Sequence, residues 1–312
     1  MTTMKAMRYD RYGGPEVLEY ANRDKPEAGA GQVLIRIRAA SVNPIDWKLR
    51  SGAMKTIIPL ELPTGAGQDV AGEIAAIGDG VDDLKVGDRV FAMMGVTPAG
   101  AYAEYIVLDR TAVARKPDTL DFVSAAAVPM GALTAWQAIV DLGGLKAGSR
   151  LFVHAAAGNV GGWAVRIGHA LGAHVTAAAS AKDRDDVMAL GADAFVDYQA
   201  GPFEQAAGDM DMVLDPLAGD IQARSWGMIK PGGILVSTLM VGEPEEAKAR
   251  GVRAAMVQGH PDGGELALIA KMIDDGKLVP RIGRVMSLDE AGEAQRLGEA
   301  GEVKGKIVLE MA

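Results

Sequence analysis

The segment that most constrains the fold spans residues 154–164 and reads HAAAGNVGGWA. It follows an apolar run at residues 151–153 and precedes a stretch with helical periodicity. Its small residues align with the pattern G-x-G-x-x-G at Ala156, Gly158 and Gly161, with alanine in the first place. Small side chains in such a turn let the backbone approach a pyrophosphate, and the helix N-terminus supplies free N–H groups and a partial positive charge. Close packing of a strand on a helix is the alternative interpretation.

The surrounding chain changes character near residue 120. Before this point, β-rich segments such as residues 33–38 and 103–107 alternate with glycine and proline, which predicts a barrel-like β domain. After it, strands and helices alternate, which predicts an α/β domain with a parallel sheet covered on both faces. The expected strands are residues 151–154, 175–179, 194–197, 212–214 and 234–237, and the expected helices are residues 161–171, 182–190 and 265–275.

A last strand is expected at residues 306–310, where it could rejoin the first domain. The predicted domains are therefore residues 1–121 with 267–312, and residues 122–266.

Composition argues against several classes of partner. The chain has 32 lysines and arginines against 41 aspartates and glutamates and no basic patch, so we do not expect nucleic acid. No apolar run reaches the roughly 18 residues of a membrane span, and the first ten residues lack the apolar core of a signal peptide. We therefore expect no membrane partner and a cytoplasmic location. Cysteine is absent and no two of the four histidines are spaced as a helical metal pair, so we expect no bound metal.

The end of the second predicted strand of the α/β domain bears on which dinucleotide would bind. In such folds an acidic residue about 20 residues after the glycine turn binds the adenosine ribose. Here the strand ends at Ser180 and is followed by Lys182 and Arg184, a hydroxyl and two cations that would attract a 2′-phosphate. We therefore predict NADP(H) rather than NAD(H). The alternative is a solvated helical turn in which nearby aspartates balance the two cations.

Segments along nearly the whole chain resemble one protein family. They are MKAMRYDRYGGPEVLEY, AASVNPIDWKLRSG, TGAGQDVAGEIAAIGDGVDDLKVGDRVFA, GALTAWQAI, the glycine turn, LGADAFVDY, KPGGILVS and VKGKIVLEM. In order and spacing they resemble the medium-chain dehydrogenase/reductase superfamily, and within it the zinc-free quinone oxidoreductase branch. The resemblance implies a GroES-like β domain made from the N-terminal part and the C-terminal tail, a Rossmann domain between them, and a homodimer.

The sequence departs from the zinc-containing relatives at the metal ligands. Asn43 stands where those relatives carry a cysteine, and Gln68 and Asp69 stand where they carry a histidine and a glutamate. Amide side chains are poor zinc ligands, so a Lewis acid is not expected. This favours hydride transfer to an acceptor that is already electrophilic, namely a quinone or an α,β-unsaturated carbonyl compound.

The resemblance also implies which side chains form the site. It places Asn43 beside the nicotinamide and the substrate. Asp46 lies three residues later and is a candidate to orient the ribose or to relay a proton. The alternatives are a turn residue before proline for Asn43 and an exposed helix cap for Asp46. Lys306 either reaches the cofactor or is solvated. With Asn43, the predicted cofactor contacts are Thr134, Ala157, Gly158, Asn159, Val160, Gly161, Ser180, Lys182, Arg184, Tyr198, Leu217, Ser237, Thr238, Leu239, Met256 and Val257.

Some of these positions have simpler interpretations. Thr134 could be a buried helical threonine bonded to its own backbone, and Tyr198 an ordinary residue at a strand end. His154 is expected to be a buried histidine with a hydrogen-bond partner rather than a general acid. For the whole protein, the alternatives to a quinone or enone reductase are a non-catalytic NADPH-binding protein and an enoyl-thioester reductase. The physiological acceptor, the proton donor and the choice between one- and two-electron reduction stay open.

Overall fold

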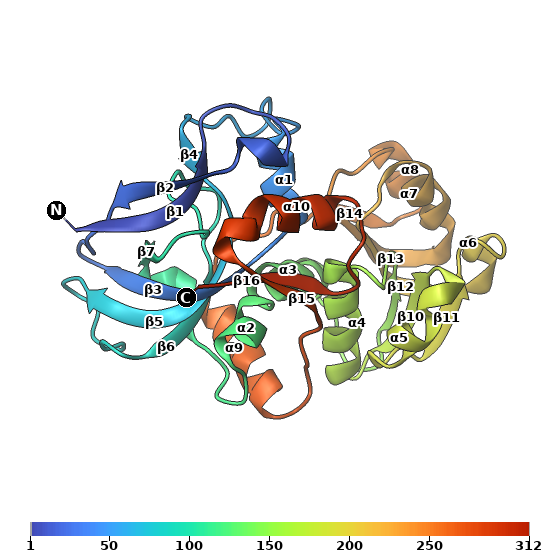
Figure 1. Ribbon diagram of the computed structural model, residues 1–312. Coiled ribbons are helices and arrows are strands. Elements are labelled where there is room, and N and C mark those ends of the chain that lie inside the picture. The colour runs from blue at the N-terminus through green and yellow to red at the C-terminus, as the bar shows by residue number, and fades with distance from the viewer. Residues whose placement is uncertain (1, 312) are drawn as a thin grey trace. The chain divides into compact units, whose positions relative to one another are not determined.

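The computed structural model describes residues 2–311, which form two compact units (Figure 1). Unit 1 comprises residues 2–130 and 260–311, and unit 2 comprises residues 131–259. No helix within the described residues is both long enough and apolar enough to cross a membrane.

Unit 1 contains two β-sheets. The larger has seven strands, with β15 (Ile282–Ser287), β16 (Lys306–Glu310), β3 (Gln32–Ser41), β5 (Asp69–Ile77), β6 (Arg89–Met93) and β8 (Val113–Arg115) in this order and β7 (Tyr105–Asp109) paired with β3. The smaller has β2 (Glu19–Asp24), β1 (Thr3–Tyr9) and β4 (Thr64–Gly65). The helical segments are η1 (Pro15–Val17), α1 (Pro44–Arg50), η2 (Arg110–Ala112), α2 (Phe122–Ala126), α9 (Gly263–Asp274), η6 (Leu288–Glu290) and α10 (Ala291–Glu299).

The central strand β3 shows why this part of the sequence is a buried strand. Val33, Ile35 and Ile37 alternate along it and lie in the apolar core, whereas Arg36 between them is exposed. Each fully buried aliphatic side chain contributes about 1.5–3 kcal/mol. β3 also pairs with β16, and Figure 1 shows this red C-terminal strand beside the blue β3. The last strand therefore rejoins the first part of the chain, as expected.

Unit 2 is a six-stranded sheet in which every pair of neighbours is parallel. In chain order its strands stand 3-2-1-4-5-6, the order of the Rossmann fold. They are β11 (Ala194–Asp197), β10 (His174–Ala179), β9 (Arg150–Val153), β12 (Met210–Asp215), β13 (Ile229–Ser237) and β14 (Arg253–Met256). The helical segments are the π-helix η3 (Gln137–Leu142), α4 (Asn159–Ala170), η4 (Ala181–Asp183), α5 (Arg184–Met188), α6 (Phe203–Ala206), α7 (Gly219–Ser225), η5 (Trp226–Met228) and α8 (Pro244–Ala249).

This strand order creates a switch point at the carboxyl ends of β9 and β12, the first and fourth strands. Helix α4 leaves β9 and packs on β9 and β10, whereas α7 leaves β12 and packs on it. The chain therefore turns in opposite directions after these two neighbouring strands. In open parallel sheets this is where a ligand binds.

The unit boundaries differ from those expected after residues 121 and 266. Helix α2 packs on β3 and β5, and the first turn of α9 packs on β8, so both helices belong to unit 1. Helix α3 (Pro129–Trp136) begins at the end of the first segment of unit 1 and continues into unit 2. Sequence periodicity located α9 but neither α2 nor α3, and it carries no information about the sheet on which a helix packs.

Candidate active site

The glycine turn joins β9 to α4 and is compact. Ala155 adopts a left-handed conformation with φ of +47°, and the Gly158 N–H donates to the Ala155 carbonyl oxygen at 2.9 Å. Gly158 is the N-cap of α4, and both Ala157 and Gly158 are exposed. A Cβ at Gly161 would lie only 2.3 Å from the Ala155 oxygen, so only glycine fits there. The turn therefore presents exposed backbone at a helix N-terminus, the arrangement that binds phosphate.

A buried carboxylate organises the loops after the neighbouring strands. Asp215, at the end of β12, accepts hydrogen bonds from the backbone N–H groups of Leu217 at 2.9 Å and Ala218 at 3.0 Å. It also accepts from the side chain of Gln222 at 2.8 Å, and Gln222 in turn donates to the Met240 carbonyl oxygen at 2.8 Å. One aspartate thus fixes the loop after β12 and, through Gln222, the loop after β13.

The carboxyl edge of the sheet also exposes apolar side chains. Leu217, Leu239, Met240 and Met256, which follow or end β12, β13 and β14, have relative exposures of 47%, 45%, 62% and 42%. Three of them are predicted cofactor contacts, and Thr238 beside Leu239 is partly exposed. An apolar, accessible edge of this kind suits an aromatic ring.

Two predicted contacts in this region are buried instead. The Ser237 hydroxyl accepts the Leu239 N–H at 3.2 Å, and the Val257 N–H donates to the Ser237 carbonyl oxygen at 2.9 Å. Ser237 and Val257 are therefore buried residues that hold the backbone at the carboxyl edge of the sheet in place.

Thr134 lies in α3, nearly buried, close to the backbone that follows β14. A Cβ built on Gly259 would lie 2.7 Å from the Thr134 hydroxyl oxygen, so these two segments are in close contact within unit 2. This position is compatible with the prediction that Thr134 lies near the nicotinamide. It is equally compatible with a buried helical threonine bonded to its own backbone.

The segment after β10, which is predicted to bind the adenosine 2′-phosphate, differs from the single helix expected at residues 182–190. Ser180 is the N-cap of the short 3-10 helix η4, and α5 begins at Arg184. The Arg184 guanidinium lies over the Phe195 ring at 5.2 Å, while Lys182 is exposed. Tyr198 is 48% exposed and its N–H donates to the Ala179 carbonyl oxygen, so its ring is at the surface. The hydroxyl and the two cations therefore follow the carboxyl end of β10, as expected from the sequence.

The second group of predicted site residues forms a buried polar cluster in unit 1. The Asn43 side-chain NH2 donates to Asp69 Oδ2 at 2.9 Å, and its oxygen accepts from the Lys306 ammonium. Asp69 Oδ2 also accepts from the Ser41 hydroxyl at 2.9 Å, and Asp69 Oδ1 accepts the Met130 N–H at 2.9 Å. Asn43 and Asp69 have no exposed surface. Burial raises the pKa of Asp69, but the three donors leave its two oxygens paired, and we assign it as a carboxylate.

Asp46 belongs to the same cluster. Its Oδ2 accepts the Asn43 backbone N–H at 2.7 Å and the Tyr102 hydroxyl at 2.9 Å, which caps the first turn of α1. Asp46 is 2% exposed, and burial raises its pKa from 3.8 to about 7 against the effect of these two donors. The helix-cap alternative for Asp46 is therefore observed, but the cap is buried rather than exposed. Its Oδ1 has no hydrogen-bond partner among the described residues and is the free position for a proton.

Lys306, which the sequence left as either a cofactor contact or a solvated residue, is buried. It is 6% exposed, so the solvated alternative is wrong. Burial lowers the pKa of Lys306, and the Coulomb effects of Asp69 and Asp46 oppose this shift. In the sequence, Asp69 stands out only as a position that aligns with a metal ligand, and Tyr102 does not stand out. Their role depends on strand pairing, which no local motif shows.

The positions that align with zinc ligands do not fit a zinc ion. They hold Asn43, Gln68 and Asp69, two amides and one carboxylate. The Lys306 ammonium lies 3.8 Å from Asp69 Oδ2 and binds the Asn43 oxygen, so the carboxylate already has a cation. A metal ion at this point would have to displace a buried ammonium.

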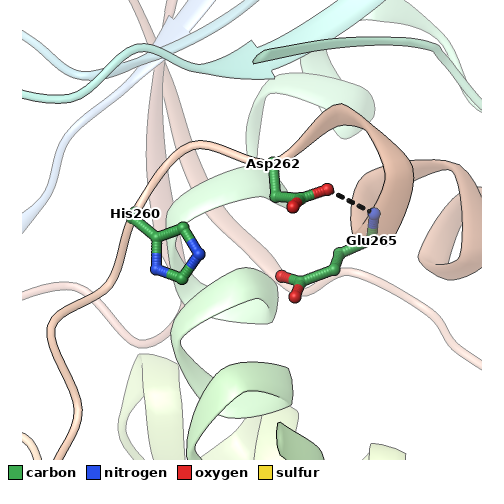
Figure 2. A group of neighbouring side chains, drawn as sticks. All are labelled: His260, Asp262 and Glu265. Carbon is green, nitrogen blue, oxygen red and sulfur yellow. Dashed lines mark hydrogen bonds between the residues drawn. The ribbon is translucent and has the colours of Figure 1, made fainter. Parts of the chain in front are cut away.

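One other group of side chains within residues 2–311 has ligand atoms that could hold an ion. His260, Asp262 and Glu265 offer ligand atoms within 4.8 Å of one another (Figure 2). Asp262 caps α9 by accepting the Glu265 N–H at 2.9 Å, and the positive end of this helix faces the group. Both features disfavour a cation.

His154 follows β9 and is buried, as the sequence suggested. Its Nε2 lies 2.9 Å from the Ser225 hydroxyl, and its ring packs edge-on against Phe152 and Phe203. Because the Ser225 hydroxyl donates to the Ile221 carbonyl oxygen at 2.7 Å, Nε2 carries the proton and donates to Ser225. Burial lowers the pKa of His154 to about 4, so the ring stays neutral near pH 7.

Comparisons with known proteins agree with this arrangement. Residues 29–118 match the alcohol dehydrogenase GroES-like domain, and residues 190–309 match the zinc-binding dehydrogenase family. The chain is 32% identical to the mitochondrial NAD(P)H oxidoreductase RTN4IP1 of Danio rerio, over 99% of this chain and 91% of that protein. It is 33% identical to the 2-methylene-furan-3-one reductase of Solanum lycopersicum, over 98% and 79%. The structure of the quinone oxidoreductase from Coxiella burnetii is similar with a TM-score of 0.90 and 33% identity, over 100% of both chains.

Proposed function

Because this chain belongs to the quinone oxidoreductase branch of the medium-chain dehydrogenase/reductase superfamily, we propose that it is a zinc-independent, NADPH-dependent reductase of quinones or α,β-unsaturated carbonyl compounds. The observation that carries the proposal is the glycine turn at the switch point of the parallel sheet, where Gly161 leaves no room for a side chain. The turn would hold the pyrophosphate, and the apolar edge formed by Leu217, Leu239 and Met256 would support the nicotinamide. When bound, the cofactor supplies a hydride.

The residues of the chain supply binding and orientation. Quinones and conjugated carbonyl compounds are electrophilic without a Lewis acid. Their reduction is therefore compatible with Asn43, Gln68 and the paired carboxylate of Asp69 at the positions that align with zinc ligands. The buried polar cluster of Asn43, Asp46, Asp69 and Lys306 holds its groups rigidly, so they need no reorganisation during the reaction. Asp46 carries a proton position at Oδ1 and is the candidate for the proton donor.

The preference for NADPH over NADH is the finer part of the proposal. Ser180, Lys182 and Arg184 follow the carboxyl end of β10 and provide a hydroxyl and two cations for a 2′-phosphate. K182A/R184A should weaken NADPH binding by about 1–3 kcal/mol and leave NADH binding unchanged. R150A/K230A is the charge-matched control, because Arg150 and Lys230 lie at the amino ends of β9 and β13. Equal loss for NADPH and NADH would contradict the assignment.

An assay of NADPH oxidation tests the reaction. The acceptors are 1,4-benzoquinone, 9,10-phenanthrenequinone, 2-alkenals and crotonyl-coenzyme A, and we expect turnover with the quinones or the alkenals. Tight NADPH binding without turnover on any of them would favour a non-catalytic NADPH-binding protein. Turnover with the thioester alone would favour an enoyl-thioester reductase.

We propose in addition a homodimer located in the cytoplasm, with no nucleic-acid or membrane partner. The acidic net charge of −9 supports the absence of nucleic acid. Light scattering coupled to size-exclusion chromatography measures the oligomeric state, and a monomer at micromolar concentration would refute the dimer.

A further inference from the structure

Lys306 reaches the buried polar cluster through strand pairing. β16 is antiparallel to β3, with Val308 opposite Ser41, and the Val42 N–H donates to the Ile307 carbonyl oxygen at 2.9 Å. Continuing this register by two residues brings Lys306, the first residue of β16, opposite Asn43, the second residue after the end of β3. The contact between two residues 263 positions apart is therefore fixed by the sheet.

The charges on either side of Asn43 determine the orientation of its amide. An ammonium can only donate and a carboxylate can only accept, so the Asn43 oxygen must face Lys306 and its NH2 must face Asp69. A flipped amide would place its NH2 group against the Lys306 ammonium and its oxygen against the Asp69 carboxylate. Because all three groups are buried, water does not screen this preference.

The same residue holds the start of α1. The Asn43 backbone N–H is bonded to Asp46 Oδ2, and the Asp46 N–H donates to the Asn43 carbonyl oxygen at 2.9 Å. Fixing Asn43 therefore also fixes the carboxyl group proposed as proton donor. Lys306 itself does not contact Asp46 through a hydrogen bond given by the structure, so it acts on this group through Asn43.

We propose that Lys306 is a positioning residue for the reductase reaction: its ammonium locks the amide of Asn43 against Asp69 and thereby orients the catalytic end of α1. The inference rests on the proposed function. It assigns to a buried lysine the organising role that a metal ion has in zinc-containing relatives, since two of the three positions that align with metal ligands, Asn43 and Asp69, are already paired with this cation.

The test compares four variants. K306M removes the charge and the donor, K306R retains both, and K306M/D69N removes both charges of the buried pair so that no carboxylate is left uncompensated. Neutral replacement of a buried pair is often tolerated, so the double variant separates folding from positioning. K271M is the matched control, because Lys271 is exposed on α9 and pairs only with Asp275 among the described ion pairs.

Two measurements decide the outcome. In folded K306M and K306M/D69N, we expect kcat to fall about 10- to 100-fold, while the Kd for NADPH stays within threefold of wild type. K306R should retain most of the wild-type kcat. K271M should have the wild-type kcat. In 15N–1H spectra of asparagine-labelled protein, assigned with N43A, the Asn43 NH2 signals should exchange slowly in wild type and K306R and shift or exchange fast in K306M. Unchanged kcat in both K306M and K306M/D69N, or unchanged Asn43 signals in K306M, would overturn the proposal. A wild-type protein without turnover but with protected Asn43 signals would refute the proposed function instead.

Discussion

Replacing Gly161 with alanine tests whether the glycine turn binds a cofactor or is only a close contact between a strand and a helix. A Cβ at residue 161 would lie 2.3 Å from the Ala155 carbonyl oxygen and 2.9 Å from its carbonyl carbon, both backbone atoms. At Gly162, the next residue of α4, the nearest atom to a Cβ is the Ala156 carbonyl oxygen at 3.4 Å. G162A is therefore a matched control in the same helical turn.

The expected magnitudes follow from these distances. Ordinary contacts of this kind are about 3.5 Å, so G161A must move the turn or the start of α4 by about 1 Å. Such overpacking costs about 1–3 kcal/mol, and alanine regains up to about 1 kcal/mol in helix propensity. The net loss of stability should be about 0–2 kcal/mol, whereas G162A should gain up to about 1 kcal/mol.

Binding should change more than stability in G161A. Moving the first turn of α4 by about 1 Å removes a hydrogen bond between a backbone N–H and a charged phosphate oxygen, worth about 1.5–3 kcal/mol. The Kd for NADPH should therefore rise about 10- to 150-fold, with little change in G162A. Titration of NADPH fluorescence measures Kd, and urea unfolding confirms that each variant is folded. Equal NADPH affinity in the two variants would refute the assignment of this turn as the phosphate site.

Three further predictions concern protonation and metal binding. The pKa of Asp46 rises from 3.8 to about 7 on folding, so the folded state binds this proton more tightly than the unfolded state. Relative to D46N, the wild-type protein should therefore lose at most about 4 kcal/mol of stability as pH increases from about 4 to about 7. The pKa of His154 falls from 6.5 to about 4, so the sign is opposite: relative to H154Q, wild type should lose up to about 3 kcal/mol as pH decreases through this interval. Urea unfolding across pH checks both, and a pH-independent difference in either pair would contradict the corresponding assignment. Added Zn²⁺ should raise the melting temperature of wild type no more than that of H260A, and a zinc-dependent rise confined to wild type would reveal a metal site at His260.

Local sequence patterns were sufficient for five of the six strands of unit 2 and for helix α4. The strand expected at residues 194–197 coincides with β11 of unit 2, and the strand expected at residues 306–310 coincides with β16 of unit 1, because each is a short apolar run ended by a charged residue. The glycine turn was located by its own small residues, and the structure adds the reason for Gly161. Such features depend on neighbours in the chain, which the sequence displays directly.

Features that depend on tertiary packing were less accessible. The helix expected at residues 182–190 is divided into η4 and α5, with Asp183 as the N-cap of the second segment. The unit boundaries moved because α2 and α9 pack on strands of unit 1. Periodicity shows which face of a helix is apolar, but it does not show which sheet covers that face.

The buried polar cluster could have been partly inferred once the strand pairing was considered. The segment KIVLE places a lysine directly before three apolar residues of a strand expected to rejoin the β domain. Whether this lysine is buried depends on the face of the sheet on which its side chain lies, and a buried ammonium requires a hydrogen-bond acceptor or a negative charge. The segment alone therefore leaves open whether Lys306 is solvated or paired with a buried acceptor. Only the register that sets Val308 opposite Ser41 identifies the partners as Asn43 and Asp69, and register is a property of the paired strands rather than of either segment alone.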